Sequence, residues 1–274
     1  MADPYLTPVA VPEGAATRRL RRAEAPLWWR LVGGALIPVA LVAIWWAVTA
    51  LELLPPYRLP SPLAVVQAAG NLPITHDLPL DIAISTQRVF IGFAIGAGLG
   101  LVMGAVVGLS KSASVLLGPL LSALRAVPSL AWAPLLLLYL GLFETPKITL
   151  VAIGAFFPIF TALSGALRHV DAHLIEMGRA YGLGPLQVLT TVRLPAVIPT
   201  IVSGLRLSLS QAWLFLVAAE IIGASLGLGS LLVDAGQSAR VDIMFLVIIL
   251  LAVLGRITDA IVGLAEWLLL KRWG

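Results

Sequence analysis

Long apolar segments separated by short polar stretches constrain this chain more than any other feature of its sequence. They cover residues 33–53, 87–109, 114–142, 148–167, 196–222 and 243–264. A bilayer core about 30 Å thick is crossed by roughly 20 helical residues, so each segment is long enough for one transmembrane helix. The third segment is interrupted by Arg125 and Pro128. We therefore predict an all-α polytopic membrane protein with six transmembrane helices.

The composition agrees with this prediction and excludes several kinds of site. Hydrophobic residues make up 59% of the 274 and charged residues only 12%, a balance that soluble globular domains do not show. The sequence has no cysteine, so disulfides, thiolate metal sites and cysteine nucleophiles are excluded, and its three histidines are scattered. No catalytic triad, nucleophile elbow or paired-carboxylate motif is visible. We expect neither an enzyme nor a metal or cofactor site on this chain.

Positively charged residues are distributed unevenly between the two sets of segment ends. Most Lys and Arg residues outside the apolar segments lie in the N-terminal stretch, in alternate loops and at the C-terminus, including Arg18, Arg19, Arg21, Arg22, Arg30, Lys111, Arg168, Arg179, Arg193, Lys271 and Arg272. Because Lys and Arg collect on the cytoplasmic side, both termini are predicted to be cytoplasmic in a cell-membrane protein. The net charge of +4 then reflects topology and anionic lipid, and no nucleic-acid partner is expected.

This topology divides the chain into a basic cytoplasmic tail (1–32), a six-helix domain (33–270) and a short cytoplasmic C-terminal tail (271–274). The apolar stretch that follows the arginines is about 20 residues long, too long for the core of a cleavable signal. Residues 33–53 are therefore predicted to remain as the first span.

The loops 54–82 and 223–242 fall on the external side. Ser61 followed by Pro62 is a favourable helix start, so a short surface helix is predicted over 62–70. The second loop is predicted to make tight turns at its glycines, Gly223, Gly227 and Gly229.

The second apolar segment carries a glycine at every fourth position, at Gly92, Gly96, Gly100, Gly104 and Gly108. In lipid, small residues at this spacing let two helices approach closely. We predict that this face packs against a neighbouring helix rather than contacting a transported solute.

Polar residues inside the predicted spans are costly in lipid, and each suggests a function. The candidates for lining a transport pathway are Arg125, Arg206, Gln211, Trp213 and Glu220. Arg125 and Arg206 could attract an anion or pair structurally, and a structural or gating role is favoured for Glu220. Arg256 and Asp259, three residues apart, are expected to neutralise each other.

One polar loop is longer than a simple connection needs. It contains Glu176–Pro195, with the sequence EMGRAYGLGPLQVLTTVRLP. We predict a short helix that starts near Asp171, a break at Gly184-Pro185, a second short stretch, and a stop at Leu194-Pro195. Asp171 and Glu176 would lie in the early turns of the first helix, where carboxylates interact favourably with the helix dipole.

The spacing Glu176, Gly182 and Val192-Arg193-Leu194-Pro195 resembles the EAA loop of permease subunits of ATP-binding-cassette (ABC) importers. Met177 and Gly178 replace the two alanines of that pattern, and Val192 replaces an isoleucine. Further stretches resemble the nitrate, sulfonate, taurine and bicarbonate branch of this family: LPSP (59–62), LRAVPSLAWAPLLLLYLG (124–141), ETPK (144–147), FFPI (156–159), GLRLSLSQAW (204–213), AAE (218–220) and GLGSLL (227–232).

The resemblance implies a type I importer (MetI-like) permease fold in which the 168–195 loop couples to separate ATPase subunits. The residues it points to for coupling are Asp171, Glu176, Gly182, Leu194 and Pro195. It also implies two ATPase subunits, which would hold ATP and Mg²⁺, a second copy of this permease, and an external solute-binding protein docking on the external loops. No Gly-Lys pair exists for a phosphate-binding loop, so this chain is not expected to bind ATP that way.

Alternatives remain open at this point. A small anion is expected as substrate, with an aliphatic sulfonate or taurine first, while nitrate, bicarbonate, an aromatic carboxylate or a pyrimidine fit the same machinery. A secondary transporter driven by an ion gradient would need deep carboxylates, and Glu220 is the one candidate in the sequence. A membrane-embedded assembly subunit would leave the loop at Glu176–Pro195 unexplained.

Overall fold

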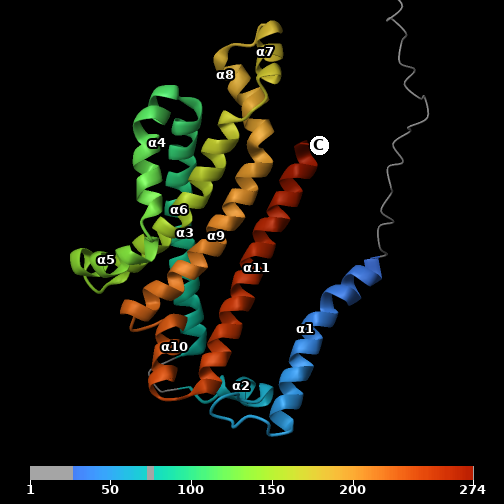
Figure 1. Cartoon of the computed structure of the whole chain (residues 1–274), viewed down its shortest axis with the longest axis vertical. Helices are drawn as coiled ribbons and strands as arrows, with labels where there is room; N and C mark the ends of the chain where they lie inside the picture. Colours follow the sequence, from blue (N-terminus) through green and yellow to red (C-terminus); the bar gives the residue numbers. More distant parts are fainter. Residues whose placement is uncertain (1–26, 73–76, 274) are drawn as a thin grey trace, which may run out of the picture.

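The computed structural model describes residues 27–72 and 77–273, and every regular element within them is helical. The elements, drawn in Figure 1, are α1 (Leu27–Ala50), α2 (Pro62–Ala68), α3 (Leu78–Leu109), α4 (Lys111–Ala126), a 3₁₀ turn (Ser129–Ala131), α5 (Trp132–Leu140), α6 (Glu144–Arg168), α7 (Ala172–Ala180), α8 (Pro185–Val188), a π-helical turn (Leu189–Arg193), α9 (Leu194–Gly223), α10 (Leu228–Gln237) and α11 (Val241–Trp273). Most of the predicted basic tail, residues 1–26, lies outside the described residues.

Within the described residues, four helices are long and apolar enough to cross a bilayer: α3, α6, the run from Pro185 to Gly223, and α11. A fifth crossing is possible through α4 and the segment Ser129–Leu140, which are bent by 77° at Pro128. The all-helical membrane fold is thus confirmed, and the irregularity expected near Pro128 is a sharp bend. The described apolar part of α1, Leu36–Ala50, is shorter, so the sixth crossing stays a prediction.

The predicted start of the second span is wrong, because hydropathy misses polar residues that helices bury. The span was placed from residue 87, but α3 begins at Leu78 and includes Asp81 and Ser85, both fully buried. At the chain ends, α1 begins at Leu27 and α11 continues to Trp273, so helix extends into both predicted tails, whose cytoplasmic location stays a prediction.

The external loops are more helical than expected. The short helix predicted after Ser61 is present as α2, with the Ser61 hydroxyl accepting from the Ala64 N–H at 3.2 Å. In the second loop, however, Gly223 ends α9 and Gly229 lies inside α10, so the tight turns predicted at these two positions are wrong. Gly227, with φ of +117°, alone of the three takes the left-handed backbone that favours glycine.

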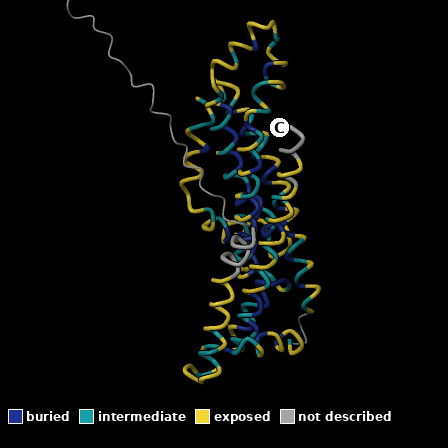
Figure 2. Tube along the Cα trace, turned by 90° about the vertical axis from the view of Figure 1, so that its right-hand side faces the viewer, coloured by how far each residue is buried: buried dark blue, intermediate teal, exposed yellow. Residues whose placement is uncertain are grey.

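The centre of the bundle is formed by α3, α6 and α9, and Figure 2 shows buried residues running along its length. The glycine face of α3 lies against α6. A Cβ at Gly92 would meet Val151 at 2.6 Å, one at Gly100 would meet Ile159 at 2.5 Å, and one at Gly96 would overlap the backbone of Ala152. Gly104 and Gly108 face Leu163 and Leu167 of the same helix. The two backbones therefore approach closely along the whole interface.

This close approach predicts a position-specific loss of stability. Gly96→Ala is expected to lower the free energy of unfolding by about 1–3 kcal/mol, because the new methyl group has no room against α6. Gly98→Ala, on the same helix with nothing within 4 Å of its Cβ, is the matched control and should leave stability unchanged. Thermal unfolding of the purified variants in one detergent tests this. Equal melting temperatures for both variants would contradict it.

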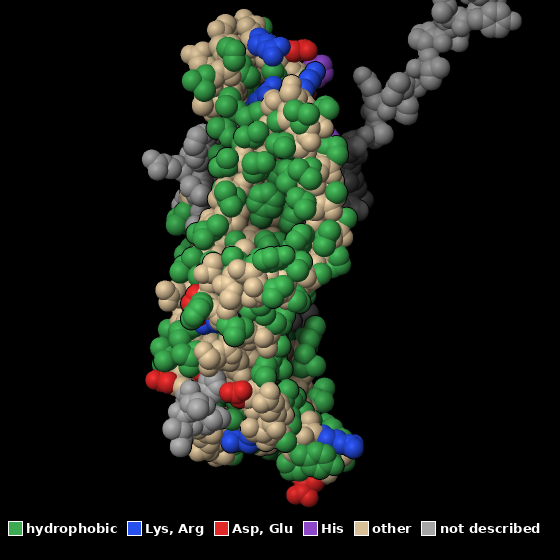
Figure 3. All heavy atoms as spheres, turned by 90° about the vertical axis from the view of Figure 1, so that its left-hand side faces the viewer, with side chains coloured by type: hydrophobic (Ala, Val, Ile, Leu, Met, Phe, Trp, Pro, Cys, Tyr) green, Lys and Arg blue, Asp and Glu red, His purple; other side chains and the backbone are tan. Residues whose placement is uncertain are grey.

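The two ends of the bundle differ in structure. The α7 end holds α7, α8 and the end of α11, while the α10 end holds α2, α10 and the segment after α1 (Figure 1). Figure 3 shows apolar side chains over most of the face that carries α4 and α5, with charged side chains gathered toward the two ends. This distribution fits a protein whose middle lies in lipid and whose two ends meet water.

Candidate functional site

The loop between α6 and α9 is shaped by specific caps. Asp171 is the N-cap of α7, and its carboxylate accepts from the His173 N–H at 2.9 Å. At the other end, Gly182 has φ of +80°, and the Gly182 and Leu183 N–H groups donate to the carbonyls of Arg179 and Gly178. This is the Schellman arrangement that ends a helix at a glycine. The caps at Asp171 and Gly182 therefore set the length of α7, and Glu176 lies in its middle.

The predicted stop at Leu194-Pro195 is wrong, because the helix continues through it. The turn Leu189–Arg193 is π-helical, and the Leu194 N–H donates to the Leu189 carbonyl five residues back. Pro195 has no N–H to offer the preceding turn, so a local widening of the helix is the less costly arrangement. These two residues thus mark a bulge at the start of α9, between the loop and the span.

The same loop presents apolar side chains to solvent at the α7 end. Its exposed large apolar residues are Leu174, Met177, Tyr181 and Leu186, and Tyr181 is 81% exposed. Glu176 is exposed beside them. Gly178 is buried and faces Val188 and Val192, so α7 packs on the start of the next helical run through its glycine. Apolar side chains on a rigid, otherwise polar projection are typical of a surface that binds a partner.

A cluster of polar and charged residues lies near the α10 end, all buried except Glu144, and we call it the Arg88–Glu220 cluster: Asp81, Ser85, Arg88, Glu144, Lys147 and Glu220. The Glu220 carboxylate is fully buried and accepts from Arg88 Nη1 at 2.6 Å, from the Ser85 hydroxyl at 2.9 Å and from the Gly229 N–H at 2.8 Å. Arg88 also donates to Glu144 at 2.6 and 2.7 Å. Lys147 Nζ lies 3.2 Å from Glu144 Oε1 and completes the cluster.

The cluster fixes the connection between α9 and α10. Arg88 donates to the Leu226 carbonyl at 2.7 Å, the Gly227 N–H donates to Asp81 at 2.7 Å, and the Leu228 N–H donates to Ser85 at 2.9 Å. A Cβ on Gly227 would collide with the Glu220 carboxylate. This connection is therefore held to α3 by buried, charge-assisted hydrogen bonds.

The partners of Glu220 were not predicted from the sequence. Asp81, Ser85 and Arg88 are spaced by four and three residues, so they share one face of α3. This shared polar face on an apolar helix was a signal that a partner such as the Glu220 carboxylate packs against it. Glu220 lies inside the protein as part of this cluster, which agrees with the structural role favoured for it.

The two intramembrane arginines differ in their surroundings. Arg206 Nε and Nη2 both donate to the Asp259 carboxylate at 2.8 Å. Asp259 also accepts from Arg256 at 2.8 Å, so the expected Arg256–Asp259 pair is in fact shared with Arg206. Arg125, in contrast, is exposed in the last turn of α4, and its hydrogen bond within the described residues goes to the neutral Thr161 hydroxyl at 3.3 Å.

The other two pathway candidates lie on α9. Trp213 is buried, and its Nε1–H donates to the Thr258 hydroxyl at 3.0 Å, which joins α9 to α11. Gln211 is partly exposed. The structure therefore does not bring the five pathway candidates together in one place within this chain.

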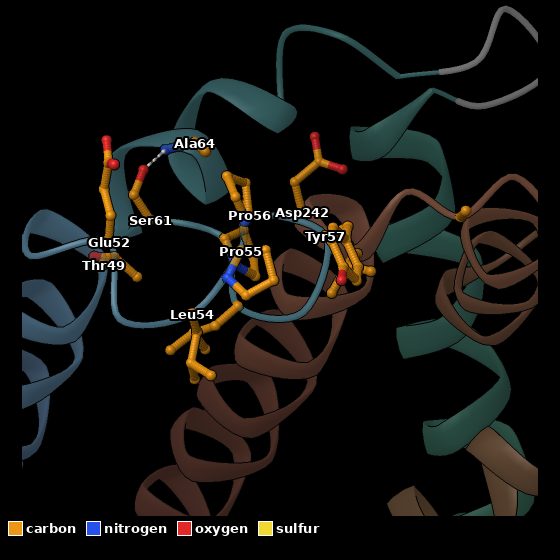
Figure 4. A pocket seen from close by; sticks show the side chains of 13 residues that line it. Thr49, Glu52, Leu54, Pro55, Pro56, Tyr57, Ser61, Ala64 and Asp242 are labelled. Atoms are coloured by element: carbon orange, nitrogen blue, oxygen red, sulfur yellow. Dashed lines mark hydrogen bonds between the residues drawn. The ribbon is translucent and has the colours of Figure 1, made fainter.

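A hollow of about 680 Å³ lies at the α10 end, between the segment after α1 and the start of α11. Figure 4 shows Glu52 and Asp242 on opposite sides of it, with Pro55 and Pro56 between them and Tyr57 on the side of Asp242. Arg240 donates to Asp242 at 2.7 Å, and this hydrogen bond raises the pKa of the Arg240 guanidinium. The two predicted external loops thus meet around one cavity whose mostly apolar lining includes two carboxylates.

The described helices thus form a membrane bundle with a capped loop that exposes apolar side chains at one end and a hollow that contains Glu52 and Asp242 at the other. The sequence model of the binding-protein-dependent transport system inner membrane component matches residues 96–267. The chain belongs to this family, and the resemblance to ABC importer permeases is confirmed.

Relatives with assigned names are similar over most of their length. The chain is 41% identical to the putative aliphatic sulfonates transport permease protein SsuC of Bacillus subtilis, covering 87% of this chain and 86% of the relative. It is 39% identical to the SsuC protein of Escherichia coli (90% and 93%) and 32% identical to the taurine transport system permease protein TauC of Escherichia coli (78% and 80%). The inward-facing MetNI methionine ABC transporter has a similar fold, with a TM-score of 0.52 at 23% identity, covering 70% of this chain and 92% of that one.

Proposed function

We propose that this chain is the membrane permease of an ABC importer for aliphatic sulfonates. The observation that carries the proposal is the 41% identity over 238 residues to a permease named for aliphatic sulfonates, with no large part of either chain unmatched. Taurine is the second candidate, supported by 32% identity over 219 residues. Import rather than export follows from the family, whose members work with a substrate-binding protein.

Energy would be supplied by two ATPase subunits that bind the α7 end, which we place in the cytoplasm together with both termini. ATP and Mg²⁺ would be held by those subunits and no cofactor by this chain. The exposed apolar residues of the α6–α9 loop support this assignment, because a groove on the partner can cover them. Asp171 and Gly182 would act by shaping α7, and Glu176 would lie at the contact itself.

The binding protein would dock at the α10 end. The hollow between the two external loops in Figure 4, with carboxylates on both sides, supports a polar docking surface there. A second copy of this permease would complete the transporter. Figure 1 shows α1 leaning away from α11, and its side chains at Leu36, Ile37 and Val39 are more than half exposed, so a large apolar surface is left for lipid or another subunit.

Uptake in cells tests the proposed function. We expect deletion of this chain to abolish uptake of labelled pentanesulfonate, and expect wild-type uptake to stop when ATP is depleted but to continue when the proton gradient is collapsed. Labelled taurine and nitrate are the comparison substrates. Uptake that survives ATP depletion and fails without the gradient would instead identify a secondary transporter. Sulfonate uptake that is unchanged by the deletion would exclude the proposed substrate.

A further inference from the structure

An apolar groove runs along the face where α4 and α5 cross α3 and α6. It has a volume of about 420 Å³, and its larger lining residues include Ile95, Leu99, Leu124, Trp132, Phe156 and Phe157. The single hydroxyl in the lining belongs to Thr149, and it donates to the Thr145 carbonyl at 2.7 Å. The groove therefore offers mainly aliphatic and aromatic surface, and no charged side chain is among its lining residues.

Arg125 lies at one end of this groove. Its neighbour Leu124 is part of the lining, and Arg125 Nη1 donates to the Thr161 hydroxyl, which in turn donates to the carbonyl of Phe157 at 2.8 Å. The guanidinium is thus one helical turn away from a lining residue. The distance along α4 from Lys111 to Arg125 is about 21 Å at 1.5 Å per residue. With Lys111 at the membrane surface, as the predicted topology has it, this charge would lie deep in the bilayer.

A charge at this depth needs a counterpart or a water-filled space. Arg206 has its counterpart within the chain, because Asp259 neutralises it. For Arg125 the described residues supply a neutral hydroxyl at 3.3 Å, although its side chain is exposed. Arg125 thus has no carboxylate partner among the described residues and is free to bind an anion, and the groove beside it would favour an anion with an apolar tail.

We propose that Arg125 and this groove form a transit site for the aliphatic sulfonate, with the sulfonate on Arg125 and the alkyl chain in the groove. This inference rests on the proposed function and names the residues that would bind the substrate during transport. A sulfonate stays ionised at neutral pH, and its oxygens accept hydrogen bonds from the forked guanidinium. Each methylene that enters the groove strengthens binding by about fourfold. The ammonium group of taurine would find no carboxylate in the lining.

The test uses the complete transporter, reconstituted in liposomes with its ATPase subunits and saturating loaded binding protein. ATP-dependent uptake of methanesulfonate and of hexanesulfonate is measured, and their ratio is compared between variants. The preference of the binding protein is the same in every variant and cancels in this comparison. Leu99→Trp fills the groove from a position that is 56% exposed, so folding is little affected. Val102→Trp, on the same helix and 61% exposed but outside the lining, is the matched control.

We expect Leu99→Trp to reduce hexanesulfonate uptake at least tenfold and methanesulfonate uptake much less, while Val102→Trp leaves their ratio unchanged. Arg125→Gln should reduce the uptake of both sulfonates at least tenfold, and Arg125→Lys should restore part of it. Equal losses for both sulfonates in Leu99→Trp would indicate a lipid or subunit contact and overturn the site. Unchanged uptake in Arg125→Gln would also overturn the proposed site. The proposed function would then remain, because the wild type still imports the sulfonate. Absence of any sulfonate uptake by the wild type would remove the proposed function and this site together.

Discussion

Replacing Arg88 by methionine is expected to lower the free energy of unfolding by about 3–5 kcal/mol, because it leaves Glu220 as an unpaired charge inside the bundle. The Glu220 carboxylate would keep the hydrogen bonds from Ser85 and Gly229 but lose its counter-ion. The Leu226 carbonyl would lose its donor as well, so the connection between α9 and α10 should loosen. Unfolding in mixed detergent micelles, followed by tryptophan fluorescence, measures the loss.

Arg206→Met is the matched control for this prediction. It removes an arginine from a carboxylate that keeps a second arginine, Arg256, and that is partly exposed. Its cost should be about 1 kcal/mol or less. The double variant Arg88→Met with Glu220→Met should be more stable than Arg88→Met alone, since it removes the stranded charge. Similar losses for Arg88→Met and Arg206→Met would show that the cluster does not hold the fold in this way.

The parts of this fold that sequence predicts are those decided by neighbouring residues. Apolar runs located the long helices, and Ser61-Pro62 located α2, because hydropathy and capping act over a few residues. The spacing within the loop located α7 for the same reason, since Asp171 and Gly182 cap a helix that they bound directly.

The parts that sequence missed depend on residues far apart in the chain. Arg88 and Glu220 are separated by 132 residues, and Arg206 and Asp259 by 53. Neither pair follows from local spacing, so the charges could be recognised as costly but not assigned partners. The first nine residues of α3 were not predicted as part of the span for a related reason. The polar residues among them are buried by contacts near α9 and α10, and hydropathy does not register such contacts.

The largest functional effect is expected at the α7 end, from the double substitution Tyr181→Ala with Leu186→Ala. Both side chains are more than 70% exposed, so their removal should leave the permease as stable as the wild type. In an interface, large apolar side chains of this kind contribute about 1–4 kcal/mol each, which is roughly fivefold or more in affinity per residue. We therefore expect binding of the ATPase subunits to fall at least about thirtyfold, and ATP-dependent uptake to fall with it.

Co-purification of the ATPase with tagged permease, together with ATP-dependent uptake in liposomes, measures both effects. Ile257→Ala is the control, because Ile257 is an exposed apolar residue in the middle of α11 rather than on the loop. If the loop couples ATP hydrolysis to transport, the double variant loses the ATPase and the control retains it, while both melt at the wild-type temperature. If the double variant retains both the ATPase and uptake, the contact lies away from these two side chains. If it retains the ATPase but loses uptake, the rest of the loop binds the ATPase, and Tyr181 and Leu186 transmit the movement of the ATPase to the membrane helices.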